Sequence, residues 1–245
     1  MRSMNRFERT AATLALLVVP GFAPPLPGGF VNGDFQQGFA GWKTKEFTRT
    51  SGQAQADAQL AIDDSLTFVG GDQTMAELSV TASAGSLGAG AGPGNSAVSV
   101  ARLEQELSAI PSTSLSLQWA SGFGATVFAN GTIRWSAKLR VRHAGPFIAS
   151  REAARGYELE FLGGRIDGEE DCGVGFAVDG RPINPHRVDI DLAAAGFEPG
   201  DDVVVSVEFQ VLALAPEACD FVGFGGSLWV DRFILNPPKV RKASL

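Results

Sequence analysis

Apolar and polar side chains alternate with a period of two in several separate segments of this chain. The longest example is residues 132–142, where hydroxyl and basic residues alternate with Ile133, Trp135, Ala137, Leu139 and Val141. Segments 114–119, 157–161 and 202–212 repeat the pattern. Because successive side chains of a strand point to opposite faces, each segment is predicted to be a strand with one buried face.

Turn signals separate these segments, at Asn130-Gly131, Gly163-Gly164, Asp179-Gly180, Pro199-Gly200 and Gly225-Gly226. No long stretch carries a helical stripe, and the two helical candidates, 148–155 and 191–195, are short. We therefore expect an all-β fold with roughly nine or ten strands, arranged as an antiparallel β-sandwich of jelly-roll type.

The length of 245 residues suits one such sandwich, which we place at residues 30–236. Residues 1–23 have the pattern of a signal peptide, because three arginines precede an apolar run at 11–19 that is too short to span a bilayer. The alternative is an N-terminal helix of the domain. Residues 24–29 are predicted to be a Pro/Gly linker and 237–245 a polar tail. The expected location is secreted, cell-surface or periplasmic, with no transmembrane segment.

The net charge bears on which partners the chain can bind, and the cysteine count bears on whether it forms a disulfide. The formal net charge is −7, which argues against a nucleic-acid partner because the phosphate backbone repels an acidic surface. The two cysteines, Cys172 and Cys219, are an even number in a chain predicted to be exported, which favours one disulfide. Two buried free thiols are the alternative.

Signals for catalysis are few. The nearest match to a nucleophile elbow is 84–88, which lacks the first glycine of that motif and falls in a glycine-rich loop. The acidic residues of 167–171 are more typical of a solvated loop than of a carboxylate pair. We therefore expect that the protein is not an enzyme.

Four segments carry a family resemblance through their order along the chain: residues 30–42 (FVNGDFQQGFAGW), 101–121, 188–211 and 227–235 (SLWVDRFIL). Together they resemble the carbohydrate-binding-module jelly rolls, of the family 4 and family 9 type, in the galactose-binding-like superfamily. The resemblance implies a non-catalytic module that binds carbohydrate at a cell surface or in extracellular matrix. The alternative is a structural or adhesive surface protein that binds protein or its own copies.

The resemblance also implies a structural Ca²⁺ that ties the opening segment to the closing strand. The matching positions are Asp34, Gln36 and Asp231. Gln36 departs from the family pattern, because an amide oxygen is a poorer Ca²⁺ ligand than a carboxylate, and Arg232 would oppose a cation. The alternative is that Asp34 caps a tight turn at Asn32-Gly33-Asp34, while Asp231 pairs with Arg232 or a backbone amide.

Sugars stack on aromatic rings and bond to polar side chains, so the candidate ligand-binding residues are Trp119, Trp135, Tyr157, Trp229, Arg134 and Arg140. Trp119 and Trp135 are in register with core-facing residues, which favours a place in the core. Trp229 lies on the face opposite Leu228 and Val230, either exposed or lining a cleft. The basic stripe, Arg134, Lys138, Arg140 and Arg142, would suit an anionic polysaccharide or would simply be a solvated outer face.

Overall fold

The computed structural model describes residues 29–68, 71–85, 94–128, 130–144, 156–168, 174–179, 185–216 and 220–236. Several sequence predictions lie outside these residues. They are the signal peptide at 1–23, most of the linker, the polar tail at 237–245, the helical candidate at 148–155, and both Cys172 and Cys219.

The described chain confirms the all-β prediction. It contains eleven strands and one 3₁₀ turn, Ala193–Ala195, at the second helical candidate. The strands are β1 (Lys43–Ser51), β2 (Ala54–Phe68), β3 (Gly71–Gly85), β4 (Asn95–Leu107), β5 (Ser114–Phe128), β6 (Thr132–His143), β7 (Gly156–Asp167), β8 (Val174–Asp179), β9 (His186–Asp191), β10 (Val203–Ala215) and β11 (Phe221–Asn236).

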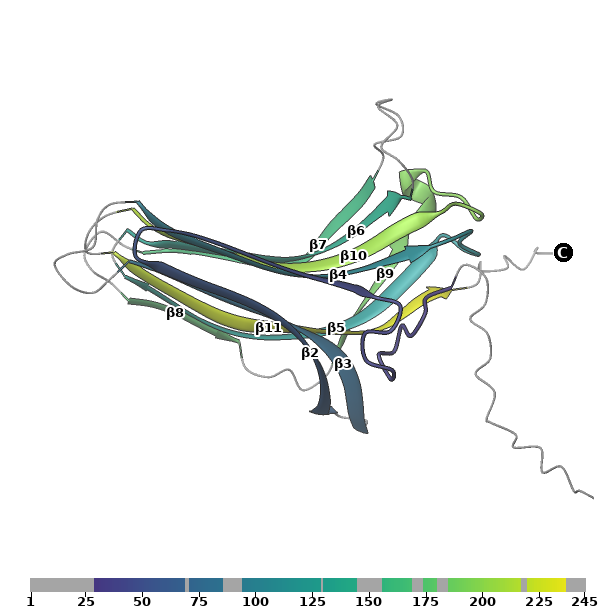
Figure 1. Cartoon of the computed structure of the whole chain (residues 1–245), viewed down its shortest axis with the longest axis horizontal. Helices are drawn as coiled ribbons and strands as arrows, with labels where there is room; N and C mark the ends of the chain where they lie inside the picture. The colour runs from purple at the N-terminus through teal and green to yellow at the C-terminus, as the bar shows by residue number, and fades with distance from the viewer. Residues whose placement is uncertain are drawn as a thin grey trace, which may run out of the picture.

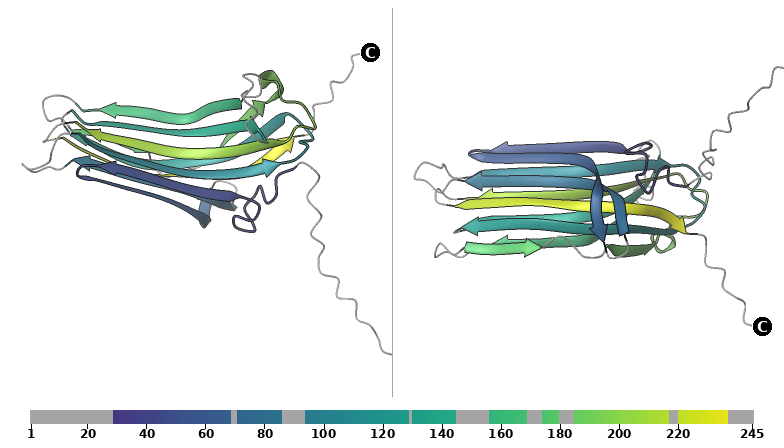
Figure 2. Two further views of the ribbon diagram at one scale, coloured as in Figure 1. Left: turned by 45° about the horizontal axis from the view of Figure 1, so that its top comes forward. Right: turned by 90° about the horizontal axis from the view of Figure 1, so that it is seen from below.

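The strands form two stacked sheets, in which every pairing is antiparallel (Figures 1 and 2). One sheet has the strand order β1-β4-β10-β6-β7. The other has the order β2-β3-β11-β5-β8, and β9 pairs with the remaining half of β5. Successive strands often change sheets, as in a jelly roll, so the expected β-sandwich is confirmed.

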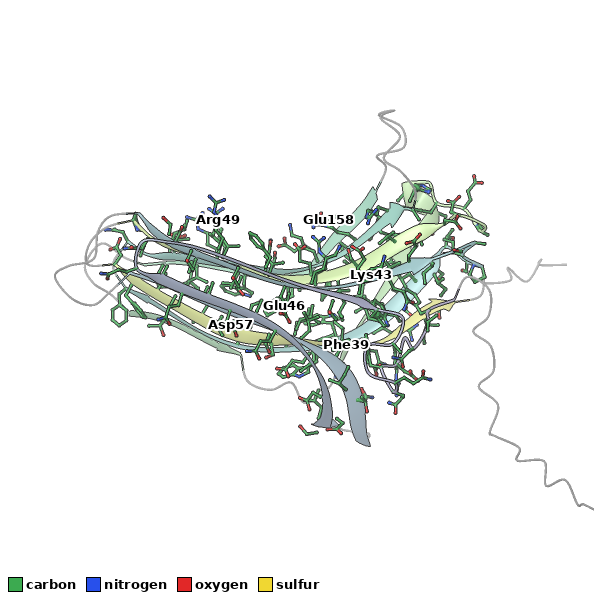
Figure 3. All side chains as sticks on the ribbon, in the orientation of Figure 1. Phe39, Lys43, Glu46, Arg49, Asp57 and Glu158 are labelled. Atoms are coloured by element: carbon green, nitrogen blue, oxygen red, sulfur yellow. The ribbon has the colours of Figure 1, made fainter. Side chains whose placement is uncertain are left out.

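Both sheets bend in the same sense along the molecule. Figure 1 shows that the outer face of the five-stranded sheet is concave, whereas the outer face of the six-stranded sheet is convex. Alternate side chains of β4, β6, β7, β10 and β1 therefore project onto a hollowed surface, on the side where Arg49 and Glu158 point away from the second sheet (Figure 3). This surface is called the concave face below.

The inner faces of the two sheets meet in one continuous apolar core. In β10, the fully buried inner residues include Val203, Val205, Val207 and Phe209, and in β6 they include Leu139. Burying each such side chain contributes about 1.5–3 kcal/mol relative to leaving it exposed. The strand segments predicted from alternation are all present, and each continues beyond the C-terminal end of the predicted segment.

Two of the predicted turns were wrong. Gly163-Gly164 lies inside β7 and Gly225-Gly226 lies inside β11. A Cβ atom at Gly164 would lie 2.3 Å from the ring of Trp135, and one at Gly226 would lie 2.7 Å from the Cβ of Phe123. These glycines make room for aromatic packing against the strand backbone rather than for chain reversal. The turn at Pro199-Gly200 is confirmed.

The opening segment closes one end of the sandwich. The predicted turn at 32–34 is confirmed, and Phe35 behind it is fully buried with its ring centroid 5.3 Å from Trp42 and 6.1 Å from Phe233. The backbone N–H of Phe233 donates to the carbonyl of Gly33 at 3.0 Å. The opening segment is therefore joined to the closing strand by a main-chain hydrogen bond and an aromatic cluster.

Candidate functional site

The concave face holds an open groove of about 640 Å³, a size typical of ligand sites. Its lining comes from β4, β10, β6 and β7. Val98 and Leu212 form an apolar floor, and beside them the amide Nε2 of Gln210 donates to the hydroxyl of Ser136 at 2.9 Å. The groove therefore combines an apolar surface with hydrogen-bonding groups, which suits a ligand that has both apolar and hydroxylated faces.

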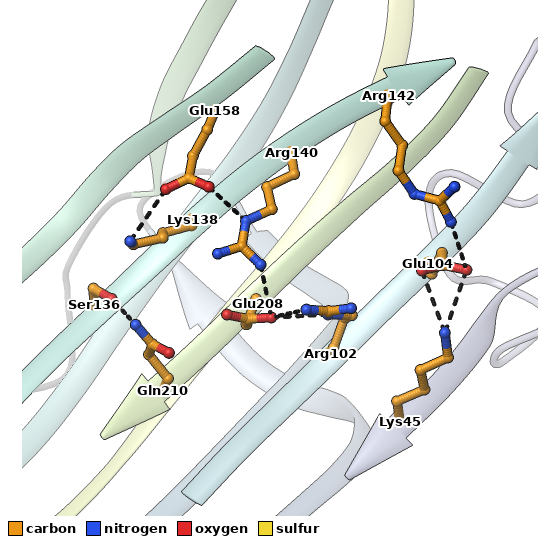
Figure 4. Close-up of polar contacts among 10 residues, drawn as sticks. All are labelled: Lys45, Arg102, Glu104, Ser136, Lys138, Arg140, Arg142, Glu158, Glu208 and Gln210. Atoms are coloured by element: carbon orange, nitrogen blue, oxygen red, sulfur yellow. Dashed lines mark hydrogen bonds and ion pairs between the residues drawn. The ribbon is translucent and has the colours of Figure 1, made fainter. Parts of the chain in front are cut away.

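Ion pairs occupy most of the rest of the concave face (Figure 4). The buried carboxylate of Glu208, on β10, accepts from Nε of Arg102 at 2.8 Å and from Nη1 of Arg140 at 3.3 Å. Glu158, on β7, accepts from Nζ of Lys138 at 3.1 Å and from Nε of Arg140 at 2.7 Å. Each of these cations therefore has a carboxylate from a neighbouring strand.

The basic stripe predicted along β6 is consequently not a continuous cationic surface. Arg142 also pairs, since its Nη2 lies 3.8 Å from Glu104, which Lys45 contacts as well at 3.4 Å. The solvated outer face is the alternative that fits Lys138, Arg140 and Arg142. Arg134 differs from the rest of the stripe, because it is exposed at the groove and has no ion pair within the described part of the chain.

Two carboxylates near the groove, Glu158 and Asp167, are held in their ionised form. Hydrogen bonds from Arg140 and then from Lys138 lower the pKa of Glu158, and hydrogen bonds from Arg165 and Thr132 lower the pKa of Asp167. A general acid needs the opposite, because it must hold a proton near neutral pH. These carboxylates therefore suit ion pairing and ligand positioning better than proton transfer.

Trp135 and Trp119 were both expected to lie in the core, because they are in register with core-facing residues. Trp135 borders the groove, but its ring is buried against Phe123 at 5.0 Å and Phe224 at 5.7 Å between centroids. Trp119 is half-buried and packs at the core margin, with its ring 5.3 Å from that of Phe161 on the opposite sheet. Neither ring lies open on the concave face.

The other two aromatic candidates are also away from the groove. Tyr157 is half-buried against the core. Trp229 is 6% exposed, packs with Leu66 and Met75, and donates from Nε1 to Asp63 at 3.1 Å. The end of the β2–β3 hairpin crosses the outer face of the six-stranded sheet here (Figure 2). This corrects the expectation that Trp229 is exposed or lines a cleft, because a segment distant in sequence covers it.

Sequence reasoning missed one aromatic residue on the concave face. Phe47 on β1 is 55% exposed and lies directly opposite Val100. Every other residue of 43–51 is charged or carries a hydroxyl. A single aromatic residue in an otherwise polar strand is the signal that could have identified Phe47 from the sequence.

The three predicted metal ligands do come together. Asp34, Gln36 and Asp231 line one pocket of about 320 Å³, with Asp64 and Gln73 from the neighbouring β2–β3 hairpin. The buried oxygens Oδ1 of Asp231 and Oε1 of Gln73 have no hydrogen-bond partner in the described structure. An all-oxygen set with unsatisfied acceptors fits a hard cation such as Ca²⁺.

The alternative contacts are present in the same pocket. The Gln36 N–H lies 3.5 Å from Oδ1 of Asp34, and Nε of Arg232 lies 3.7 Å from Oδ2 of Asp231. Burial raises the pKa of Asp231 to about 6, and the charge of Asp34 adds to this shift. Among the described residues, no three acidic, histidine or cysteine side chains cluster as metal ligands, so a cation would also need amide oxygens here.

No family model and no curated protein matches the chain. Among solved structures it is similar to a carbohydrate-binding module of the β-sandwich superfamily, at 8% identity and a TM-score of 0.29, covering 82% of this chain and 59% of that one. The chain therefore spans about three fifths of that structure.

It is also similar to a carbohydrate-binding module solved with β-1,4-galactotriose, at 12% identity and a TM-score of 0.21, covering 83% and 97% of the two chains. A glycoside hydrolase domain of Endo-D from Streptococcus pneumoniae follows, at 9% identity and a TM-score of 0.28, covering 76% and 21%. A likeness at these TM-scores does not show what this chain binds. No helix in the described ranges is long and apolar enough to cross a membrane.

Proposed function

We propose that this protein is a non-catalytic module that binds carbohydrate along the concave face of its five-stranded sheet. The observation that carries the proposal is the open groove of about 640 Å³, built from β4, β10, β6 and β7 and lined by both apolar and hydrogen-bonding side chains. An open groove suits a segment of a polymer better than an enclosed small molecule.

The lining supplies the contacts that a sugar ring needs. Val98 and Leu212 would contact the apolar face of a sugar, while Ser136 and Gln210 would bond to its hydroxyl groups. The exposed ring of Phe47, on the same sheet face, would supply a stacking surface beyond the groove. Since these groups lie on adjacent strands, binding requires little rearrangement of the backbone.

Binding without catalysis is supported by the state of the nearby acids. Glu208 is buried and bonded to Arg102 and Arg140, and the pKa of Glu158 is lowered. Hydrolysis of a glycosidic bond needs two carboxyl groups, one of which holds its proton. The ion-paired carboxylates around the groove are not prepared for that role.

The test is a binding screen of the full chain against neutral and acidic polysaccharides, by affinity electrophoresis and calorimetry. Gln210→Ala should weaken binding about tenfold or more by removing a donor within the groove, equivalent to about 1.4 kcal/mol. The matched control is Gln59→Ala, an exposed amide on β2 of the other sheet, which should leave affinity within about twofold. Equal affinity of both variants and the wild type would contradict the groove as the site.

We further propose a structural Ca²⁺ in the pocket that Asp34, Gln36 and Asp231 share. There it would satisfy buried oxygens and tie the opening segment to β11. A ligand that binds only the native state stabilises it by mass action. Millimolar Ca²⁺ should therefore raise the melting temperature of the wild type, with no rise for Asp231→Asn. Asp189→Asn, on the exposed strand β9, is the control that should keep the Ca²⁺ response.

A structural or adhesive role is the second candidate. All nine residues of β1 are exposed, and β1 is the edge of its sheet, so its backbone could pair with another chain. Lys43, Lys45 and Arg49 on that strand oppose pairing with a second copy of itself. Sedimentation over a wide concentration range distinguishes the two functions, because self-association without glycan binding would favour this candidate.

Export remains part of the proposal. Secretion would place the module where surface or matrix polysaccharides occur. N-terminal sequencing of the chain recovered outside the cell would test whether the segment 1–23 is removed.

A further inference from the structure

One row of outward-facing positions crosses all five strands of the concave face. In strand order it consists of Arg49, Val98, Leu212, Arg134 and Arg165, each directly opposite the next. Arginines therefore stand on both sides of the apolar pair that forms the groove floor. Arg134 and Arg165 line the groove itself, and Arg49 projects from β1 on the same face (Figure 3).

The pairing of Arg134 with Arg165 is unfavourable for the protein alone. Like charges directly opposite each other on neighbouring strands repel. Asp167 partly offsets this repulsion, because its carboxylate lies 2.6 Å from Nε of Arg165. Arg134 has no ion pair in the described ranges, so one carboxylate serves two guanidinium groups.

The other three cations of the basic stripe each have a carboxylate partner. Lys138 and Arg140 lie within 4.0 Å of a glutamate on an adjacent strand, and Arg142 lies 3.8 Å from Glu104 on β4, which is two strands away. Glu208 and Glu104 are each shared by two cations, so the charges along most of the face are paired within the sheet. Arg134, in the row that crosses the groove, is the cation of the basic stripe without a carboxylate partner among the described residues. Guanidinium groups in such a place recognise carboxylate or sulfate oxygens through paired hydrogen bonds.

We propose that the groove ligand is an acidic polysaccharide, with a carboxylate or sulfate group bound between Arg134 and Arg165 beside the Val98–Leu212 floor. This inference rests on the proposed function and narrows it, because it assigns the class of carbohydrate. It also relocates the cationic site from the stripe along β6 to a row across the sheet.

The experiment compares each charged polymer with its neutral counterpart, using the full chain. Polygalacturonate is paired with its fully methyl-esterified form, and dextran sulfate is paired with dextran. Arg134→Gln removes the charge but keeps hydrogen-bonding groups. Arg187→Gln, on the exposed strand β9, makes the same charge change outside the concave face and is the matched control. Arg165→Gln is a second variant, and circular dichroism checks that each variant folds.

Arg134→Gln and Arg165→Gln should each weaken binding of at least one acidic polymer about tenfold or more, while Arg187→Gln changes it less than about twofold. Polygalacturonate and dextran sulfate separate a carboxylate from a sulfate ligand. If a neutral polymer binds as tightly as its acidic form and Arg134→Gln has no effect, the inference is overturned and the carbohydrate proposal stands. An equal loss with Arg187→Gln would indicate non-specific charge attraction and also overturn it. If no polysaccharide binds, this inference and the proposed carbohydrate-binding function both fail.

Discussion

At the scale of single residues, close approach of side chains to the backbone decides where glycine is needed. Gly164 lies opposite Trp135 in the β6–β7 pair, with no room for a Cβ atom. The ring of Trp135 can pack against Phe123 and Phe224 only because β7 carries no side chain at that point. A glycine inside a strand is thus part of an aromatic core.

We therefore expect Gly164→Ala to destabilise the fold by about 1–3 kcal/mol, because the new methyl group overlaps the indole ring. Urea unfolding followed by fluorescence measures this free energy. The matched control is Gly124→Ala on β5, where a Cβ would meet no atom within 4 Å, so the change should stay within about 0.5 kcal/mol. Equal stability of the two variants would show that the ring relaxes without loss.

The buried carboxyl of Asp231 makes a second residue-scale prediction, which concerns pH. Burial raises the pKa of Asp231 to about 6 in the folded chain, against about 3.9 in the unfolded chain, so folding favours the protonated form. In chelator, this group should therefore lower stability by about 2 kcal/mol as pH rises from 4 to 6.5.

The measurement is the unfolding free energy of wild type and Asp231→Asn at several pH values in EGTA. Subtracting the two curves removes the contribution of other titrating groups. The unfolding free energy of Asp231→Asn should increase relative to that of the wild type as pH rises through about 6. A difference that stays flat across this range would show that Asp231 is not desolvated in solution.

At the scale of strands, cross-strand ion pairs hold the concave face together. Glu208 on the central strand β10 links β4 and β6, through Arg102 and Arg140. Its side chain is 5% exposed, whereas Glu160 on the edge strand β7 is 52% exposed and lies 3.6 Å from Lys138. The contribution of each glutamate to folding stability therefore depends on its burial more than on the number of its ion pairs.

Glu208→Gln should thus destabilise the fold by about 2 kcal/mol, because two arginines lose their shared negative partner in a poorly solvated position. Glu160→Gln should change the free energy of unfolding by less than about 1 kcal/mol, because water screens its pair. Chemical denaturation of both variants gives the comparison. A larger loss for Glu160→Gln would contradict this ranking.

At the scale of the whole molecule, one apolar core runs between the sheets and includes residues from Phe35 to Phe233. The opening and closing segments of the chain meet in the same aromatic cluster. The prediction that residues 30–236 form one domain therefore has a thermodynamic consequence, because a shared core unfolds cooperatively.

Scanning calorimetry should show a single transition whose calorimetric and van't Hoff enthalpies agree. Two resolved transitions would instead mean that the chain holds separately folding units. Adding Ca²⁺ should move the single transition as a whole, since the proposed cation pocket joins the first and last described segments.

The fold class, the positions of β5, β6, β7 and β10, and the buried face of each of these four strands could be predicted from the sequence. These properties follow from alternation, which acts between neighbouring residues and needs no knowledge of the partner strand. Residues 132–142 illustrate this, since Trp135 and Leu139 are buried as the pattern predicted. The three expected cation-pocket residues also share one pocket in the fold.

Which side chains are available to a ligand depends on contacts between strands that are distant in the sequence. Trp229 is covered by residues more than 150 positions away, and Arg140 is paired with Glu208 at a separation of 68 positions. Such contacts depend on strand order and register, which local alternation does not encode. The same reason explains why Arg134, unremarkable within its own strand, differs from its neighbours once Arg165 and Asp167 lie beside it.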